Sequence, residues 1–217
     1  MIDLHTHTLF SDGALLPCEL ARRAEAKGYR VIGITDHVDS SNIEFVINGL
    51  SKACKDINKY WKIRAIPGVE ITHMPVECIK GAVKIARAKG ARLVVVHGET
   101  PVECVIRGTN KAGILAGADI LAHPGKISLE DARLAAKKDV HLEITARKGH
   151  SLGNKHVAAI AKKAGAKVVI DSDSHEPGDL ITKDFAEKVL SAAGLSRKES
   201  REVFRNSERL VSRLNLT

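Results

Sequence analysis

Two histidines, His5 and His7, lie one residue apart directly after a short apolar segment at the start of the chain. In an extended strand, residues i and i+2 point to the same side, so both imidazoles can reach one point in space. Converging imidazoles are a common way in which proteins hold a transition metal. Such a pair also occurs at solvated strand ends, so the pair alone leaves both interpretations open.

Further histidines and carboxylates stand where other short, β-branched apolar segments end. Six of the ten histidines occupy such positions, whereas random placement would scatter them over helices and loops. The C-terminal ends of the strands in a parallel barrel all lie on one face, where barrel enzymes place their active sites. We therefore predict a metal site formed by nine side chains: His5, His7, Asp12, His37, Glu70, His97, His123, Asp173 and His175.

The number and type of these groups indicate more than one ion. A zinc ion in a protein takes about four ligands, so the predicted set can serve two or three ions, with Glu70 as a bridging carboxylate. Mixed imidazole and carboxylate ligands suit zinc, manganese or iron better than calcium or magnesium, which prefer oxygen. We expect two to three divalent transition-metal ions.

Four other carboxylates are close to the predicted ligands in the sequence. Glu143 has the parity of a residue that faces a barrel interior, where it could orient a ligand histidine, and Glu99 is similarly placed. Asp36 and Asp171 are expected to support ligands rather than to bind metal. We assign the remaining histidines outside the loop discussed next to the surface or to packing: His73, His141 and His156.

The loop "ARKGH" follows the sixth apolar segment and carries Arg147, Lys148 and His150. A basic loop on the metal face is suited to bind a substrate phosphate, and a guanidinium can pair with it in a bidentate manner. We therefore predict that these three residues contact substrate.

Short apolar segments alternate along the chain with longer segments of helical period, which is typical of βαβ units and a parallel sheet. The expected helices span residues 16–27, 42–60, 75–89, 102–115, 129–137 and 154–163. Capping patterns mark several starts: Thr100 with Pro101 and Glu103, Ser41 with Glu44, and Ser196 with Glu199. No linker or glycine-rich nucleotide-binding motif interrupts the seven units, so we predict a single domain over residues 1–217 that forms a closed or nearly closed barrel.

The bulk composition limits the partners. The longest apolar runs are far too short to span a bilayer, and the N-terminus lacks a signal-peptide pattern, so we expect a cytoplasmic protein with no membrane contact. A net charge of +8 favours phosphate-bearing ligands. With 3% aromatic residues, and with Lys and Arg spread along the helices, a small phosphorylated substrate is favoured over nucleic acid.

The successive motifs "DLHTHTLFSDG", "ITDH", "GVEI", "VVVHGE", "LAHPG" and "VIDSDSH" resemble those of the polymerase and histidinol phosphatase (PHP) family. The resemblance runs from Ile2 to about Gly178 and implies an α/β fold, a distorted (β/α)7 TIM-like barrel with parallel strands and a trinuclear metal site. The stretch "LEITARKGH" looks like the compact, histidinol-phosphatase-like branch of the family.

The resemblance also implies how the ligands divide. One ion would take His5, His7, Glu70 and Asp173, a second would share Glu70 and add His97 and His123, and a third would take Asp12, His37 and His175. Some relatives have histidine in place of Asp12, so the resemblance leaves the metal preference and the occupancy of the third site open. The expected activity is hydrolysis of a phosphate monoester, similar to histidinol phosphate, by a metal-bound hydroxide, with Glu70, Asp173 and Arg147 as catalytic residues.

Three alternatives remain at this point. A nuclease or nucleoside-bisphosphate phosphatase of the same family would use the same metals but usually carries an inserted domain. An amidohydrolase also begins with H-x-H, yet it does not predict "ITDH" or a final D-x-H. A non-catalytic RNA-binding barrel, such as a ribonuclease P protein, would be expected to have lost ligands.

Overall fold

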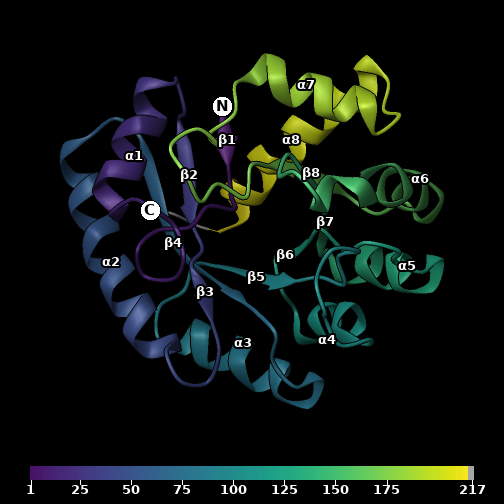
Figure 1. The fold of residues 1–217 in the computed structure, drawn as a ribbon, viewed down its shortest axis with the longest axis horizontal. Helices are drawn as coiled ribbons and strands as arrows, with labels where there is room; N and C mark the ends of the chain where they lie inside the picture. Colours follow the sequence, from purple (N-terminus) through teal and green to yellow (C-terminus); the bar gives the residue numbers. More distant parts are fainter. Residues whose placement is uncertain (215–217) are drawn as a thin grey trace.

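A ring of parallel strands occupies the centre of the computed structural model, which describes residues 1–214 (Figure 1). Every strand pair is parallel, and the spatial order around the ring follows the chain. The strands are β1 Ile2–Asp3, β2 Val31–Ile34, β3 His37–Val38, β4 Arg64–Ile71, β5 Leu93–His97, β6 Ile120–Ala122, β7 His141–Thr145 and β8 Val168–Asp171.

The first and last strands meet just beyond their ends. Thr6 forms a parallel bridge with Ser174, and the backbone N–H of His7 donates to the Ser174 carbonyl at 2.8 Å. The N–H of Asp173 donates in turn to the His5 carbonyl at 3.0 Å. These bonds nearly close the ring, and the expected (β/α)7 TIM-like barrel is confirmed.

β2 and β3 are two parts of one interrupted strand position. β2 pairs with the first half of β4, whereas β3 pairs with its end, where His37 stands opposite Glu70. The barrel therefore has seven strand positions formed by eight strands, because the segment at Thr35 and Asp36 leaves the ladder.

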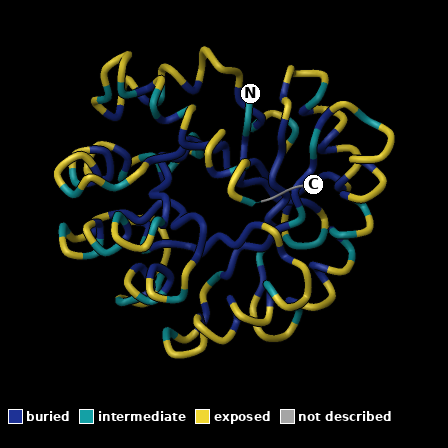
Figure 2. Tube along the Cα trace, turned by 180° about the vertical axis from the view of Figure 1, so that it is seen from behind, coloured by how far each residue is buried: buried dark blue, intermediate teal, exposed yellow. Residues whose placement is uncertain are grey.

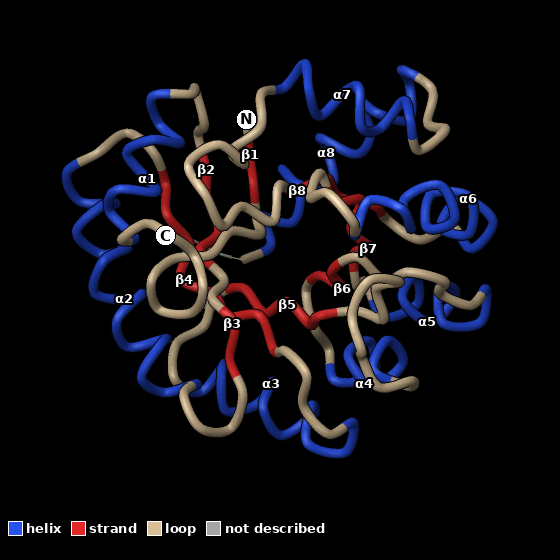
Figure 3. The backbone as a smooth tube through the Cα atoms, viewed as in Figure 1, coloured by secondary structure: helices blue, strands red, loops and turns tan. Residues whose placement is uncertain are grey.

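The described residues form eight α-helices, which lie around the strands and across one end of the ring (Figure 3). Residues at the periphery are exposed and the centre is buried (Figure 2). None of the helices in the described part of the chain is long and apolar enough to cross a membrane. The helices are α1 Pro17–Ala26, α2 Ile43–Tyr60, α3 Ile79–Ala88, α4 Thr109–Ala116, α5 Leu129–Lys138, α6 Asn154–Ala164, α7 Lys183–Ala192 and α8 Arg197–Arg213, with short 3-10 turns η1 Val76–Cys78 and η2 His150–Gly153.

One predicted helix start and one predicted helix cap are wrong. The helix expected from residue 102 begins at Thr109, after Gly108, whose φ of 101° suits glycine. The Ser41 hydroxyl donates to Asp39 at 2.6 Å rather than capping α2. The predicted capping box of Ser196 and Glu199 is confirmed at the start of α8.

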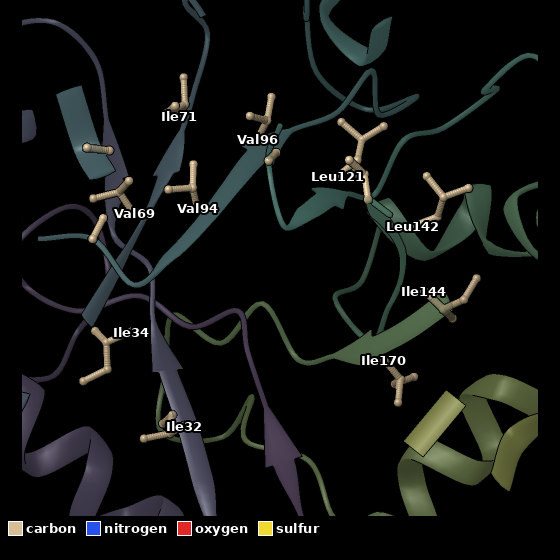
Figure 4. Packing of buried hydrophobic residues seen from close by; sticks show 14 of the residues in the cluster. Ile32, Ile34, Val69, Ile71, Val94, Val96, Leu121, Leu142, Ile144 and Ile170 are labelled. Atoms are coloured by element: carbon tan, nitrogen blue, oxygen red, sulfur yellow. The ribbon is translucent and has the colours of Figure 1, made fainter. Parts of the chain in front are cut away.

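Alternation along the strands separates two apolar clusters. Side chains on the outer side of the ring pack under the helices; Figure 4 labels Ile32, Ile34, Val69, Ile71, Val94, Val96, Leu121, Leu142, Ile144 and Ile170. Residues of the opposite parity fill the barrel: Leu4, Val31, Ile66, Leu93, Val95, Ile120, Ala122 and Val169. Because side chains alternate with a period of two, the inward parity of Ile66 continues to Glu70 in β4, and that of Val95 continues to His97 in β5.

The inner cluster is completed by α8. Leu210 is buried in it, and Val211 and Leu214 pack against it. The Asn206 side chain donates to the Val168 carbonyl at the start of β8 at 2.9 Å. α8 therefore covers the N-terminal end of the barrel and leaves the C-terminal end to the polar side chains.

Candidate metal centre

Two histidines from the segment after β1 meet two carboxylates from opposite sides of the barrel. His5 Nε2 lies 3.3 Å from Glu70 Oε2, and His7 Nε2 lies 3.2 Å from Asp173 Oδ1. The crossed distances are only slightly longer, at 3.7 Å for His7 to Glu70 and 3.8 Å for His5 to Asp173. All four side chains are buried, so four potential ligand atoms face one point that is shielded from solvent.

The ends of β5 and β6 contribute a second group around the same glutamate. His123 Nε2 lies 3.8 Å from Glu70 Oε1, and ligand atoms of Glu70, His97 and His123 all lie within 4.8 Å of one another. The rings of His97 and His123 are 4.4 Å apart, edge to face.

A third group lies toward the solvent. Asp12 Oδ1 is 3.2 Å from His175 Nε2 and 3.6 Å from His37 Nε2. The carboxylate of Asp12 is 56% exposed, whereas that of Glu70 is fully buried. His37 links the groups, because its Nδ1 lies 2.7 Å from Glu70 Oε2. The structure thus brings all nine predicted ligands together in the three combinations that the family resemblance implies; their role in binding metal stays a prediction.

The protein atoms alone do not satisfy this cluster. Six buried atoms in it have no hydrogen-bond partner within the described residues: His5 Nε2, His7 Nδ1, His7 Nε2, Glu70 Oε1, Glu70 Oε2 and His123 Nδ1. Buried polar atoms without partners cost roughly 1–3 kcal/mol each. Metal ions would supply partners to several of them, and the donor types are those preferred by zinc, manganese and iron. The residues therefore fit the divalent ions that the family implies.

Burial and mutual contact spread the pKa values of these groups. Burial would raise the pKa of Glu70, but the imidazoles of His5 and His37 outweigh it and hold that pKa well below its ordinary value. Burial raises the pKa of Asp173 to about 7. Burial and neighbouring histidines lower the pKa values of His7 and His123, which keeps both imidazoles neutral, the form that binds metal.

Buried carboxylates outside the predicted ligand set contact two of the histidines or fix the backbone that flanks His5 and His7. Glu143 Oε1 lies 2.6 Å from His5 Nδ1, and its Oε2 accepts the His123 N–H at 2.8 Å, so the predicted orienting contact is present. Asp36 accepts the N–H and the hydroxyl of Thr8 at 2.7 Å each. Asp171 Oδ1 accepts the Leu4 N–H at 2.6 Å.

Two predicted ligands sit on strained backbone. His123 has a φ of 27° and Asp173 a φ of 52°, in a region that residues other than glycine rarely adopt. Such strain costs of the order of 1–3 kcal/mol and is concentrated at functional sites. The strands end in these conformations where the side chains turn toward the cluster.

Arg147 reaches the same face from the end of β7. Its Nη1 donates to the Asp173 carbonyl at 3.1 Å, and its Nε lies 3.7 Å from Asp173 Oδ2. Arg147 and His150 line a cavity of about 240 Å³ with the outer histidines. Lys148 instead lines a neighbouring cavity of about 580 Å³ that also includes Arg147.

Glu103 is a site residue that sequence reasoning missed. The predicted capping role is wrong: its carboxylate lies 3.1 Å from His97 Nε2, 3.2 Å from His73 Nε2 and 3.3 Å from His150 Nε2. The His97 imidazole, as hydrogen-bond donor, lowers the pKa of Glu103 to about 2. The spacing Thr-Pro-x-Glu imitates a capping box, and it carries no signal of the contact.

The predictions for Glu99 and for the three histidines assigned to the surface or to packing can also be compared with the structure. Glu99 does not orient a histidine; it accepts the backbone N–H groups of Gly108 and Asn110 at 2.9 and 3.0 Å and so caps α4. His73 is exposed as predicted, yet it reaches the rim of the cluster through Glu103. His141 is buried, whereas His156 is exposed, with its Nε2 2.8 Å from the Ile127 carbonyl; both positions agree with the predicted surface or packing roles.

The comparisons with known proteins agree with this geometry. The family model of the PHP domain matches residues 3–176. An uncharacterized protein of Methanocaldococcus jannaschii is 49% identical over 199 residues, covering 91% of each chain. A protein named "Probable phosphatase" from Thermoanaerobacter sp. is 28% identical over 220 residues, covering 90% of this chain and 87% of that protein.

Solved structures show the same fold at low identity. A chain in archaeal ribonuclease P with mature tRNA aligns with a TM-score of 0.74 at 16% identity, over 99% of this chain and 91% of that one. Histidinol phosphate phosphatase from Lactococcus lactis, solved with zinc, L-histidinol and phosphate, gives 0.62 at 17% identity, over 90% and 94%. Since the family model spans most of the sequence and includes every predicted ligand, the chain belongs to the PHP family.

Proposed function

We propose that the protein is a metal-dependent phosphoesterase that hydrolyses phosphate monoesters of small molecules, with histidinol phosphate as the first substrate to test. The observation that carries the proposal is the convergence of four imidazoles on Glu70, all within 3.8 Å, next to Arg147 at the cavity. Buried donors of this kind serve metal ions, and an adjacent guanidinium serves a phosphate.

The ligand sets follow the three groups of the site. His5, His7, Glu70 and Asp173 would hold one ion, Glu70, His97 and His123 a second, and Asp12, His37 and His175 a third. When bound, such ions lower the pKa of water toward neutrality and stabilise charge on a phosphoryl group. We propose zinc, manganese or iron, with two to three ions per chain.

The chain's own residues would position and neutralise the substrate. Glu143 keeps the His5 ring oriented, and the fully buried Glu70 supplies negative charge between the ion sites. Arg147 is 32% exposed, so its guanidinium can pair with phosphate oxygens and offset charge that develops on them. His150 lines the same cavity and would act beside it.

The sizes of the cavities favour a small substrate. The cavity over the histidines has a volume of about 240 Å³, suited to a phosphate group. The adjoining cavity of about 580 Å³ shares Arg147 and is lined in part by Leu180, Ile181 and Phe185. The organic part of a monoester would lie there, with Lys148 at its edge.

Two alternatives remain, and the second has an observation of its own. A nuclease or nucleoside-bisphosphate phosphatase would use the same ligands. A non-catalytic RNA-binding barrel is favoured by the likeness to a ribonuclease P chain, but the presence of all nine predicted ligands in one cluster favours catalysis.

Turnover by the purified protein, against a panel of phosphate esters, tests the proposal. The panel contains histidinol phosphate, other small monoesters, nucleoside bisphosphates and short oligonucleotides, each assayed with added Mn²⁺ or Zn²⁺ and after chelation. We expect two to three ions per chain by elemental analysis and metal-dependent release of phosphate from monoesters. Less than one ion, with no activity regained on adding metal, would overturn the proposal, and preferential cleavage of oligonucleotides would favour the nuclease.

A further inference from the structure

We propose that Glu103 and His73 are additional ligands to the ion predicted at His97, so that the loop between β5 and α4 supplies a carboxylate that closes the substrate side of the centre. Neither residue belongs to the ligand sets that the family resemblance implies. The inference rests on the metal site of the proposed function and adds two residues to it.

The distances between the donor atoms are close to, and slightly shorter than, those of ligands that share one ion. Glu103 Oε2 lies 3.1 Å from His97 Nε2 and 3.2 Å from His73 Nε2, and these three atoms lie within 4.8 Å of one another. Two atoms that each bind zinc at about 2.0–2.2 Å in a tetrahedral arrangement lie roughly 3.3–3.6 Å apart. Two imidazoles and one carboxylate are also a common zinc donor set.

The loop is held so that Glu103 must lie over the histidines. Its start is fixed by Glu99, which accepts N–H groups at the start of α4 and whose own N–H donates to Asn110 Oδ1 at 2.9 Å. The next residue, Thr100, is buried, and its hydroxyl lies 2.6 Å from His150 Nδ1. Glu103 is therefore presented from a short arch anchored on both sides.

The side chain of His73 points toward Glu103 although its backbone is strained. Its φ of 51° is positive, although it is not glycine, and its side chain is 42% exposed. An exposed histidine has no packing reason to adopt strained backbone, which costs of the order of 1–3 kcal/mol. The conformation places its ring 5.1 Å from that of His97, with Glu103 next to both Nε2 atoms.

The position of Glu103 would affect how a substrate reaches the ion predicted at His97. His97 is 3% exposed, whereas Glu103 is 37% exposed, so the carboxylate lies on the solvent side of His97. A phosphate that approaches the ion at His97 from the cavity would meet this carboxylate first. Glu103 would therefore have to leave before a phosphate oxygen could take its place.

Metal titration of the chelator-treated protein tests this directly. Wild type, Glu103→Gln and His73→Gln are titrated with Zn²⁺ and with Mn²⁺ by calorimetry, and the absorption bands of Co²⁺-loaded protein are compared. Glu77→Gln, an exposed carboxylate on η1, is the matched control. Removing one ligand should weaken one class of ion about 10-fold or more, change the Co²⁺ spectrum, and tighten inhibition by inorganic phosphate.

The outcomes separate this inference from the function itself. If wild type binds no ion, the metal centre of the proposed function fails. If wild type binds two to three ions and both variants match it in stoichiometry, affinity and Co²⁺ spectrum, the metal centre stands and the role of Glu103 and His73 is overturned. As a control for folding, the melting temperature of each metal-free variant is compared with that of metal-free wild type. Equal melting temperatures show that a variant that loses metal is still folded.

Discussion

Glu70 is the residue on which the candidate centre depends, because its carboxylate faces four histidines from three segments of the chain. Glu70→Gln keeps the shape of the side chain but removes its charge and half of its metal-binding capacity. We expect this variant to lose bound metal and nearly all turnover while it stays folded. Elemental analysis, phosphate release and circular dichroism check the three parts, with Glu187→Gln on exposed α7 as control. Near-normal activity would show that the ligands have been assigned wrongly.

Arg147 separates substrate binding from metal binding, because a guanidinium cannot ligate a metal ion. Losing a charge-assisted contact to phosphate should cost roughly 1.5–3 kcal/mol, or about 10- to 150-fold in kcat/KM. Arg147→Ala should keep its metals and turn over monoesters more slowly, with a smaller effect on diesters, which carry less charge. Steady-state kinetics and metal analysis, with Arg201→Ala as the surface control, measure this. Unchanged kcat and KM would leave the phosphate to the metals alone.

His141 links a single buried imidazole to the stability of the fold. Burial, aided by the charge of Arg213, lowers its pKa from 6.5 to about 4, so the native state holds it neutral. In the unfolded chain His141 takes up a proton already near pH 6.5, whereas the native state resists protonation until about pH 4. The free energy of unfolding therefore has its full value above pH 6.5 and decreases as the pH falls toward 4. The difference amounts to roughly 3 kcal/mol.

His141→Gln removes this titration. Compared with wild type, the variant should lose less free energy of unfolding between pH 7 and pH 4 in urea titrations of the metal-free protein. The cluster histidines titrate in both proteins, so the difference between the two curves isolates His141. Parallel curves would mean that folding does not lower the pKa of His141.

At the scale of elements, the strands were predictable from two sequence periods, the alternation of side chains along a strand and the helical period of the segments between strands. Leu93, Val95 and His97 alternate with Val94 and Val96, so the inward parity passes from the core to the cluster without interruption. The loops were not predictable in this way. Glu103 and Glu99 exchange their expected roles because the path of the chain after β5 depends on Gly108 and on contacts to β6 and η2, which no local spacing records.

The cap of α4 gives a test at this scale. Glu99 satisfies two N–H groups at the helix start, and the loss of a capping side chain costs about 1–2 kcal/mol. Glu99→Ala should lower the free energy of unfolding of metal-free protein by that amount, as measured in urea. Because Glu99 anchors the loop that carries Glu103, the variant should also bind metal more weakly. Glu103→Ala, measured in parallel, should leave stability nearly unchanged, and equal losses in both variants would contradict the division of roles.

At the scale of the whole molecule, positive charge is arranged differently from the even spread expected from the sequence. Lys55, Lys62, Arg64 and Arg92 line one groove of about 670 Å³ together with Trp61. Arg64 begins β4 and Arg92 precedes β5, so this groove lies toward the N-terminal end of the barrel, away from the histidines. At the C-terminal end, positive charge would come instead from the proposed ions and from Arg147.

The N-terminal end of the barrel therefore contributes mainly to stability, and the C-terminal end carries the candidate site, as is usual for barrel enzymes. α8 closes the N-terminal end by burying Leu210 in the inner cluster. In the same helix, Asn206 donates to the start of β8, and Arg213 binds Asp119 and Asp139 in the turns before β6 and β7. Substituting a buried leucine by alanine removes packed atoms and leaves a cavity, which costs roughly 2–5 kcal/mol.

Leu210→Ala should therefore lower the melting temperature of both metal-free and metal-loaded protein while leaving kcat/KM and the number of bound ions unchanged below the transition. Thermal unfolding and steady-state kinetics on the same samples measure the two effects. Val203→Ala, in the same helix but packed in the outer cluster, is the matched comparison and should destabilise less, because valine loses fewer atoms. If Leu210→Ala instead altered metal affinity or kcat/KM at temperatures where it is fully folded, the inner cluster would transmit changes from one end of the barrel to the other, and the separation of stability from chemistry would not hold.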